Sequence, residues 1–235
     1  MRQAVLRFIL FTILVASLCS CLSFRNAGIP DAKGNPDEVF KQGETLFAQK
    51  QYAKAVEVLE RLKSAHPDFK KIPEVHLRIA DSLFESKDYD KAVARYTQFI
   101  ELYPLHKDIP RARYYIGLAY FNQIRNTDLD NSVVERAAQV FQSIANDTQA
   151  GEWTQKAKEK VTECRKKLGE KELYKARTYL SIKDYEAARV ALVRVLGEYS
   201  GLGLDEEAKE LLKKANKKLG LGDEPSAAQK TGNKE

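Results

Sequence analysis

Histidine and cysteine are both scarce in this chain, with three of each among its 235 residues. The histidines, His66, His76 and His106, are not spaced four apart and have no cysteine partners, so the sequence predicts no zinc site. No nucleophile and base fall at a catalytic spacing, and Gly201-Leu202-Gly203 does not follow a predicted strand, which argues against a dinucleotide-binding loop. We therefore expect a protein that is not an enzyme and that holds no metal and no cofactor.

Long apolar runs are also lacking, apart from one near the start. That run, from Phe8 to Leu18, is shorter than the roughly 20 residues that a membrane-spanning helix needs. Arg2 and Arg7 precede it and small residues follow it, which is typical of a cleaved secretory signal. We assign residues 1–20 to this signal and expect the mature chain to lie outside the cytoplasm.

The cysteines fit the same interpretation. In Leu18-Cys19-Ser20-Cys21, Leu18 and Ser20 occupy the positions of a bacterial lipoprotein signal, and Cys21 is the predicted acylated N-terminus of the mature chain. Cys19 would leave with the signal, so Cys164 has no intramolecular partner and no disulfide framework is expected. A lone cysteine in a helical segment is usually a small packing residue.

The excess of positive charge is small. Removing Arg2 and Arg7 with the signal lowers the formal net charge from +6 to +4, in a chain with 33 acidic residues. Such a balance lacks the electrostatic footprint of a nucleic-acid-binding protein, and export makes that function less plausible still. We expect no nucleic-acid partner.

What the chain does have is an internal repeat, because seven columns of residues recur at a spacing of 37. The columns are Pro36, Pro73 and Pro110; Phe40, Leu77 and Tyr114; Gly43, Ala80 and Gly117; Phe47, Phe84 and Phe121; Tyr52 and Tyr89; Ala55 and Ala92; and Pro67 and Pro104. A single helix pair cannot close a core, so neighbouring units must stack into an extended surface of the kind that binds proteins and peptides.

The order of positions within one unit, Gly43 to Tyr52 to Ala55 to Pro67, resembles the tetratricopeptide repeat with three residues added to its usual 34. This resemblance predicts an all-α fold, a right-handed superhelical solenoid of about four and a half to five helix pairs. The alternation of Gly43, Ala80 and Gly117 predicts a column where two helices approach closely, since glycine otherwise costs about 1 kcal/mol in a helix.

The expected organisation follows from these columns and from proline and glycine positions. Residues 21–35 are a tether, 36–220 the array, and 221–235 a disordered tail; the repeats lie near 36–72, 73–109, 110–150 and 152–200, and a capping helix spans 205–219. We expect an inserted loop over Gln123 to Asp130 and a long helix from Glu152 to about Leu180.

The candidate binding residues lie on the first helix of each unit at i, i+4 and i+7 spacing, which in tetratricopeptide repeats faces the concave groove. They are Phe40, Glu44 and Phe47; Leu77, Asp81 and Phe84; and Tyr114, Leu118 and Phe121. An apolar and aromatic ladder with acidic residues on its first two rungs suits an extended or helical peptide. The alternative, that the phenylalanines fill the core between repeats, is left open by spacing alone.

Lysine and arginine are dense in the second half, for example in Arg165-Lys166-Lys167, Lys213-Lys214 and Lys217-Lys218. Such faces are most often solvated, and cations near helix C-termini also complement the helix dipole. A functional alternative is docking to an acidic partner domain or to anionic headgroups.

Five short segments extend the resemblance to one family. They are Asn35-Pro36, Phe99-Ile100 with Tyr103-Pro104-Leu105-His106, Tyr114-Tyr115-Ile116-Gly117-Leu118, Glu172-Leu173-Tyr174 and Asp184-Tyr185-Glu186-Ala187-Ala188. With the lipoprotein signal and the order of repeats, the chain resembles the BamD (YfiO, ComL) family of outer-membrane assembly lipoproteins from Asn35 to Gly220. Leu22 after Cys21, in place of aspartate, agrees with outer-membrane sorting by the same resemblance.

The resemblance implies a lipid-anchored array on the periplasmic face of the outer membrane. It would act with the barrel protein BamA, through a POTRA domain, and with other assembly lipoproteins, to fold and insert β-barrel proteins. Unfolded outer-membrane proteins would bind between Phe40 and Phe121, and BamA between Glu172 and Leu219. Candidate docking residues in the second region are Arg177, Arg189, Arg194, Lys213 and Lys214.

The chain departs from the family pattern in three places. The loop of the third repeat is short and keeps only Asp128 and Asp130 of its acidic residues, the closing Tyr-Pro of repeats three and four is lost, and Ala191 stands where an arginine is frequent. Two other functions remain open: a lipoprotein of the same repeat type in pilus assembly or another envelope complex, and, more remotely, a peptidoglycan-processing accessory domain.

Overall fold

The structure is a computed structural model that describes residues 34–124 and 131–221, and within these ranges it consists of α-helices without strands. The helices are α2 (Pro36–Ala48), α3 (Tyr52–Ala65), α4 (Ile72–Glu85), α5 (Tyr89–Leu102), α6 (Ile109–Asn122), α7 (Ser132–Ala145), α8 (Glu152–Ser181), α9 (Tyr185–Glu198) and α10 (Asp205–Leu219). The predicted all-α fold is confirmed. In the described part of the chain, no helix combines the length and the apolar character that crossing a membrane requires.

Several predictions fall outside the described residues. These are the signal, the acylated Cys21, most of the tether and of the loop in the third repeat, and most of the tail. The described helices nevertheless end and begin around that loop, with α6 ending at Asn122 and α7 beginning at Ser132.

The chain divides into two compact units, Met1–Lys87 (unit 1) and Asp88–Glu235 (unit 2). The boundary falls between α4 and α5, within the predicted second repeat. The repeat bounds and the right-handed superhelix remain predictions. Counted along the chain, the described helices make four successive pairs and one closing helix, an order that fits a solenoid.

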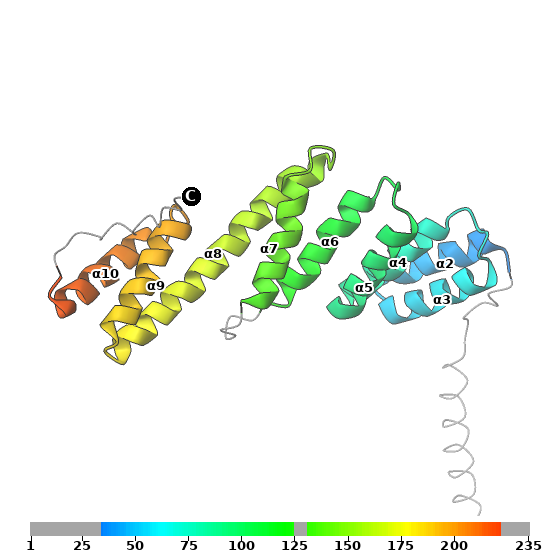
Figure 1. Cartoon of the computed structure of the whole chain (residues 1–235). Helices are drawn as coiled ribbons and strands as arrows, with labels where there is room; N and C mark the ends of the chain where they lie inside the picture. Colours follow the sequence, from blue (N-terminus) through cyan, green and yellow to red (C-terminus); the bar gives the residue numbers. More distant parts are fainter. Residues whose placement is uncertain (1–33, 125–130, 222–235) are drawn as a thin grey trace, which may run out of the picture. The chain divides into compact units, whose positions relative to one another are not determined.

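Unit 1 packs α3 against both α2 and α4 (Figure 1). Helix α2 begins with Pro36, whose missing N–H costs nothing in a first turn, and Asn35 caps it by accepting a hydrogen bond of 3.0 Å from the Asp37 backbone N–H. One apolar face of each helix meets in a core made of Val39, Val58, Leu59, Leu62, Val75 and Ile79.

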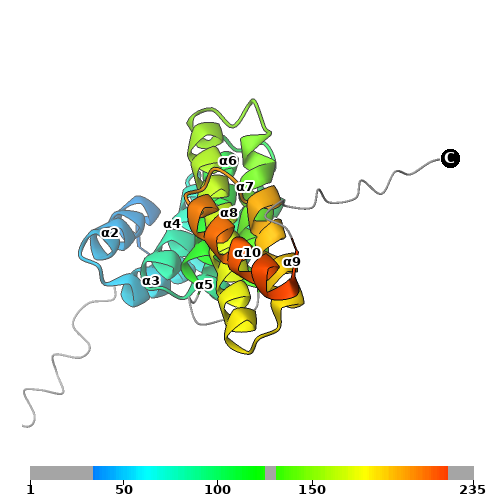
Figure 2. The ribbon, with the colours of Figure 1, turned by 90° about the vertical axis from the view of Figure 1, so that its left-hand side faces the viewer.

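Unit 2 packs each helix against the next, from α5 to α10. The 30-residue helix α8 serves two neighbours: its first half packs on α7 and its second half on α9 (Figure 1). The first core contains Phe141, Ala157 and Cys164. The second joins Leu173 of α8 to α9 and to α10, which lies beside α9 (Figure 2).

The predicted small-residue column is confirmed by the distances that a side chain would meet there. A Cβ atom at Gly43 would lie 2.5 Å from Leu59 Cδ2, and one at Gly117 would lie 2.7 Å from Phe141 Cε1. Ala80, between them in the column, is fully buried. Each position therefore sets how closely a helix approaches its neighbour.

The turns after α2, α4 and α8 share an unusual backbone conformation. Lys50, Lys87 and Lys183 have φ angles of 59°, 65° and 65°, the left-handed region that normally favours glycine. Each lies one residue before the N-cap of the following helix, so each turn contains one residue whose backbone is strained for a side chain. The sequence marked these lysines as turn residues without predicting their conformation.

Candidate functional site

The first rung of the predicted ladder is half-buried in unit 1. The ring of Phe40 meets that of Phe69 edge to face with centroids 6.1 Å apart, and the ring of Phe47 meets that of Tyr52 at 5.5 Å. Each ring on α2 is thus held by a second ring from the α3–α4 turn or from the start of α3, while part of its surface stays accessible. Phe40 and Phe47 combine a core contact with an exposed part.

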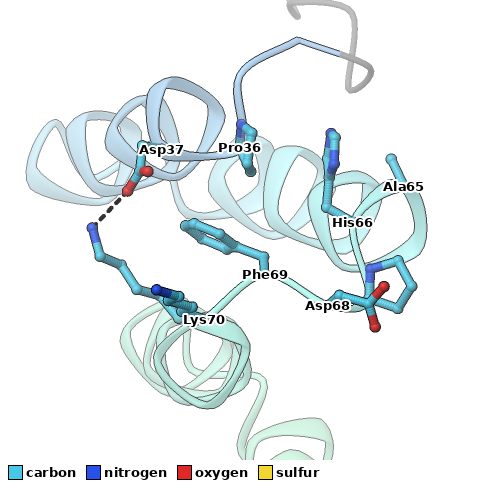
Figure 3. A pocket seen from close by; sticks show the side chains of 9 residues that line it. Pro36, Asp37, Ala65, His66, Asp68, Phe69 and Lys70 are labelled. Atoms are coloured by element: carbon cyan, nitrogen blue, oxygen red, sulfur yellow. Dashed lines mark hydrogen bonds and ion pairs between the residues drawn. The ribbon is translucent and has the colours of Figure 1, made fainter.

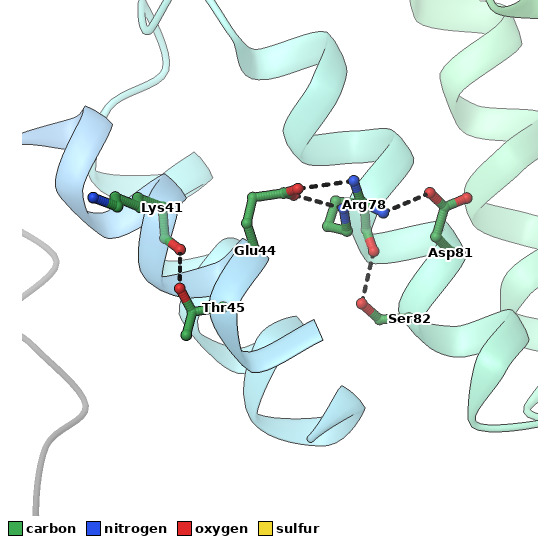
Figure 4. A network of polar contacts seen from close by, with 6 residues as sticks. All are labelled: Lys41, Glu44, Thr45, Arg78, Asp81 and Ser82. Carbon is green, nitrogen blue, oxygen red and sulfur yellow. Dashed lines mark hydrogen bonds and ion pairs between the residues drawn. The ribbon is translucent and has the colours of Figure 1, made fainter. Parts of the chain in front are cut away.

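Glu44 lies between these rings and is held by an arginine that sequence reasoning missed (Figure 4). Arg78 on α4 donates from Nε and Nη2 to the two carboxylate oxygens of Glu44, at 2.5 and 2.8 Å. Its Nη1 lies 3.4 Å from Asp81 Oδ2, and its guanidinium carbon lies 4.4 Å from the centroid of Phe47. The two acidic rungs therefore share one cation, and this face of unit 1 is less negative than expected.

A spacing in the sequence could have revealed this partner. Arg78 follows Glu44 by 34 residues, and Lys71 follows Asp37 by the same number, with Lys71 Nζ 2.7 Å from Asp37 Oδ1. Both pairs join α2 to α4 or to the residue that precedes it. Opposite charges 34 residues apart, three fewer than the repeat length of 37, are therefore the signal.

A hollow of about 570 Å³ lies at the start of α2, where the α3–α4 turn passes (Figure 3). Its lining residues are Pro36, Asp37, Ala65, His66, Pro67, Asp68, Phe69, Lys70 and Lys71. Phe69 points towards Pro36 and Asp37, and the Asp37–Lys71 ion pair crosses the side of the hollow. Since Phe69 also contacts Phe40, the hollow continues the aromatic part of the ladder.

The remaining candidates on α4 are less accessible than those on α2. Leu77 and Asp81 are both buried, with 6% of their surface exposed, whereas Phe84 is half-buried. Leu77 thus packs in the interior of unit 1, and Asp81 forms an ion pair with Arg78. The structure brings Glu44, Phe47 and Asp81 together around Arg78, whereas Phe40 lies beside Phe69 and Lys71.

The third rung lies in unit 2 and divides between core and surface. Tyr114 belongs to the first core, with its ring 5.4 Å from that of Phe141 and 5.1 Å from that of Trp153. Burial, followed by the nearby carboxylates of Glu163 and Glu159, raises the pKa of Tyr114 above its ordinary value.

Leu118 and Phe121 pack half-buried against the same core. The ring of Phe121 is faced by Lys160 Nζ at 4.7 Å and by Lys167 Nζ at 5.8 Å. The third rung is therefore aromatic and cationic, without an acidic residue of its own at the ladder position.

The candidate docking arginines lie on α8 and α9 of unit 2. Arg177 donates from Nε and Nη2 to the two carboxylate oxygens of Glu207 on α10, both at 2.7 Å. Arg194 on α9 lies 3.5 Å from Glu172 Oε2 and remains half exposed. Arg189 is partly exposed on the same helix. Two of the three arginines are therefore held by carboxylates while part of each stays accessible.

Glu172 organises the contact between α8 and α9. Its side chain is 6% exposed, yet it is paired with Lys175 Nζ at 2.8 Å as well as with Arg194. A buried carboxylate is stable only with such partners. Burial, then Glu198 and Glu172, raises the pKa of the neighbouring Tyr199 hydroxyl.

Gly169 permits this arrangement and was missed by sequence reasoning. A Cβ at this position would lie 2.7 Å from Leu204 Cδ1 and 2.9 Å from Tyr199 Cβ. Helix α8 can therefore approach the end of α9 only where it carries no side chain. Gly169 lies in a highly charged helix and belongs to none of the columns spaced by 37 residues, so the repeat pattern did not indicate it.

The remaining candidates, Lys213 and Lys214, are exposed on α10. Among the described residues, no group of three or more histidine, cysteine, aspartate or glutamate side chains is placed to hold a metal ion. Cys164 is fully buried, and burial raises the pKa of its thiol to about 12.

The family model for YfiO, described as an outer membrane lipoprotein, matches residues 32–231. The chain belongs to the YfiO family of outer membrane lipoproteins. The match spans the described residues of both units, so the α2 face and the arginines of α8 and α9 both lie within the family region.

Two further comparisons complete these findings. A crystal structure of a thermophilic tetratricopeptide-repeat protein from Thermus thermophilus aligns with 76% of this chain and 99% of its own, at 16% identity and a TM-score of 0.39. No curated protein matches the chain.

Proposed function

We propose that this outer membrane lipoprotein is an adaptor of the machinery that assembles β-barrel proteins. It binds unfolded outer-membrane proteins through unit 1 and the POTRA domain of a BamA-type barrel protein through unit 2. The observation that carries the proposal is the family match over residues 32–231. Two sets of partly exposed side chains, one in each unit, support a role in binding other proteins and not in catalysis.

The client surface is the α2 face of unit 1, defined by Phe40, Glu44, Phe47 and Arg78 and continued by the hollow at Phe69. Half-buried rings held by a second ring lose little conformational freedom on binding, so they suit the apolar side chains of an extended chain. The Glu44–Arg78 pair is partly exposed, with 34% and 28% of the side chains accessible, and offers both charges to a polar backbone or side chain.

The docking surface is the arginine set of unit 2, Arg177, Arg189 and Arg194. Arginine is enriched at protein interfaces, because its planar donors bind carboxylates at two points and its stem packs on apolar surface. Glu207 and Glu172 hold two of these side chains in fixed directions, which reduces the entropy lost on docking. An acidic surface of the POTRA domain is the expected counterpart.

The anchor is the lipid on Cys21. It keeps the protein at the periplasmic face of the outer membrane, where barrel proteins and other assembly lipoproteins are within reach. A multiply acylated cysteine supplies the two hydrophobic signals that stable anchoring needs. The protein acts by binding and not by catalysis.

Photocrosslinking in cells tests the client surface. A photoreactive residue at Phe47 should capture unfolded outer-membrane proteins, identified by mass, whereas one at Lys54, exposed on α3, should capture few or none. Equal capture at the two positions would contradict the assignment of the client to the α2 face. Capture of pilus proteins at Phe47 would favour the alternative of another envelope complex.

A charge reversal tests the docking surface. Arg189→Glu should reduce co-purification of the BamA-type protein at least about tenfold, because like charges repel a partner that Arg189 attracts. Arg136→Glu, the same change at an exposed position of α7 in the same unit, is the matched control and should leave co-purification unchanged. Unchanged co-purification with Arg189→Glu and unchanged melting would refute this docking surface.

A further inference from the structure

The end of α10 carries an unusual concentration of exposed positive charge. Four of its last seven residues are exposed lysines, and they are called the lysine face: Lys213, Lys214, Lys217 and Lys218. At 3.6 residues per turn they span roughly 140° of the helix surface. The buried residues Ala208, Leu212 and Ala215 occupy the other side and pack towards the core.

Three of the four acidic residues of α10 have partners of their own, and the fourth, Glu210, lies one turn before Lys213 and Lys214. Glu207 binds Arg177, Glu206 lies 2.9 Å from Lys209 Nζ, and Asp205 accepts a hydrogen bond of 2.9 Å from the Gly201 backbone N–H. Among the described residues, no carboxylate forms an ion pair with the three lysines Lys214, Lys217 and Lys218. Even with Glu210 one turn away, the end of the helix therefore keeps a net positive charge.

The helix dipole accounts for only part of this charge. Its negative end favours cations in the last turn, where Lys217 and Lys218 lie. The effect falls off within that turn, so it gives no reason for Lys213 and Lys214 one turn earlier. Packing gives none either, because these two side chains are exposed. A ligand of opposite charge would account for all four.

We propose that the lysine face binds the anionic phospholipid headgroups of the membrane that anchors the protein. Lysine is depleted in protein interfaces, where arginine is preferred, but it is a strongly hydrated point charge suited to phosphate groups at a lipid surface. The location is given by the family, whose members are outer membrane lipoproteins. The proposal rests on that location and not on client or POTRA binding.

The lipid anchor and the lysine face would act together. One anchor holds the chain near the bilayer, so contact between α10 and the headgroups becomes an intramolecular event with a high effective concentration. Each lysine near an anionic surface strengthens binding about fivefold. Lys213 and Lys214 would then contact lipid, leaving the arginines of α8 and α9 to the protein partner.

Vesicle sedimentation tests the proposal on the full mature chain with Cys21→Ala, which removes the anchor. Vesicles contain phosphatidylethanolamine with either phosphatidylglycerol or neutral phosphatidylcholine. The protein should sediment with the anionic vesicles at 50 mM salt, should be released at 500 mM, and should not sediment with the neutral vesicles. Such dependence on lipid charge and salt is the signature of headgroup binding.

A matched pair of variants locates the binding. Replacing the four lysines of the lysine face with glutamine should weaken binding to anionic vesicles by nearly three orders of magnitude, by the same per-lysine factor. The control replaces four exposed lysines elsewhere with glutamine and so changes the net charge equally: Lys41, Lys107, Lys158 and Lys166. The affinity of this control variant for anionic vesicles should fall by less than about tenfold.

Three outcomes would overturn the proposal. They are no binding to anionic vesicles by the starting chain, equal loss in the two variants, and vesicle binding that survives in the lysine-face variant while POTRA co-purification is lost. The last outcome would assign the lysines to an acidic protein. Melting curves check that both variants fold, and crosslinking at Phe47 reports separately on client binding.

Discussion

Arg78 on α4 holds the Glu44 carboxylate on α2 at two points and at the same time lies over the ring of Phe47. One side chain thus joins the first helices of two successive predicted repeats (Figure 4). It also contacts an aromatic ring of the candidate client surface. Arg78 therefore contacts both the polar and the aromatic parts of that surface. A change at Arg78 should therefore alter both.

Arg78→Met should lower the free energy of unfolding by about 1–2 kcal/mol, because Asp81 is buried and would lose its cation, while the partly exposed Glu44 would lose less. Thermal melting measures this change. Arg61→Met is the control, since it removes a half-exposed i, i+4 pair with Glu57 and should cost less than about 0.5 kcal/mol. Equal costs would show that Arg78 has no special structural role.

Gly117→Ala should destabilise unit 2 by about 1–3 kcal/mol, the usual cost of overpacking, because the new Cβ would lie 2.7 Å from the fully buried ring of Phe141. Gly197→Ala is the opposite case, since nothing lies within 4 Å of a Cβ there. It should stabilise α9 by about 0.5 kcal/mol through helix propensity. Denaturant unfolding compares the two, and stabilisation by both would refute the close approach at Gly117.

Lys183→Gly should raise the free energy of unfolding by up to about 1 kcal/mol. Lys183 adopts a φ of 65°, a conformation that is strained for a residue with a Cβ atom but nearly free of strain for glycine. Lys166→Gly, in the middle of α8, should instead lower stability by about 1 kcal/mol. Melting curves of the two variants should therefore shift in opposite directions. A loss of stability with Lys183→Gly would show that the lysine side chain contributes more than its backbone strain costs.

Cys164 should resist thiol reagents in the folded protein. Its pKa is raised from 9.0 to about 12 by burial, so only about one molecule in ten thousand carries the reactive thiolate at pH 8. Labelling of the Cys21→Ala chain at pH 8 should be slow without urea and fast in urea. Equal rates would show that the α7–α8 core opens readily.

The same shift has a consequence for stability. Because the folded-state pKa lies above the unfolded value, the neutral thiol favours folding at all pH values below about 9. That contribution is lost as the pH rises from about 9 towards 12. Cys164→Ala should therefore weaken the decline of stability with pH in this range, as followed by melting at each pH.

Local signals predicted the elements well. The closing helix was expected over residues 205–219 and spans Asp205–Leu219, and the long helix was expected to end near Leu180 and ends at Ser181. Proline in first helical turns and the Lys-Gln or Lys-Asp turns act within a few residues, so they can be interpreted without tertiary structure. The small-residue column was predictable because its spacing repeats.

The candidate site was predicted less completely. Three residues at equivalent positions, Phe40, Leu77 and Tyr114, have different environments: the first is half-buried, and the other two are buried. Helical periodicity assigns a residue to a face of its helix. It does not specify how much of that face the next helix covers.

The sequence by itself determined the all-α fold, the order of helix pairs, the close approach at Gly43 and Gly117, and the resemblance to the family. These follow from short-range preferences repeated along the chain. Only the tertiary structure decided that Arg78 neutralises Glu44 and Asp81, that Tyr114 belongs to a core, that Gly169 lies against Leu204, and that Lys214, Lys217 and Lys218 lack carboxylate partners among the described residues. Apart from the Arg78–Asp81 pair, which lies within α4, each of these depends on residues far apart in the sequence or on charges from neighbouring helices, and such distances are set by how the helices pack.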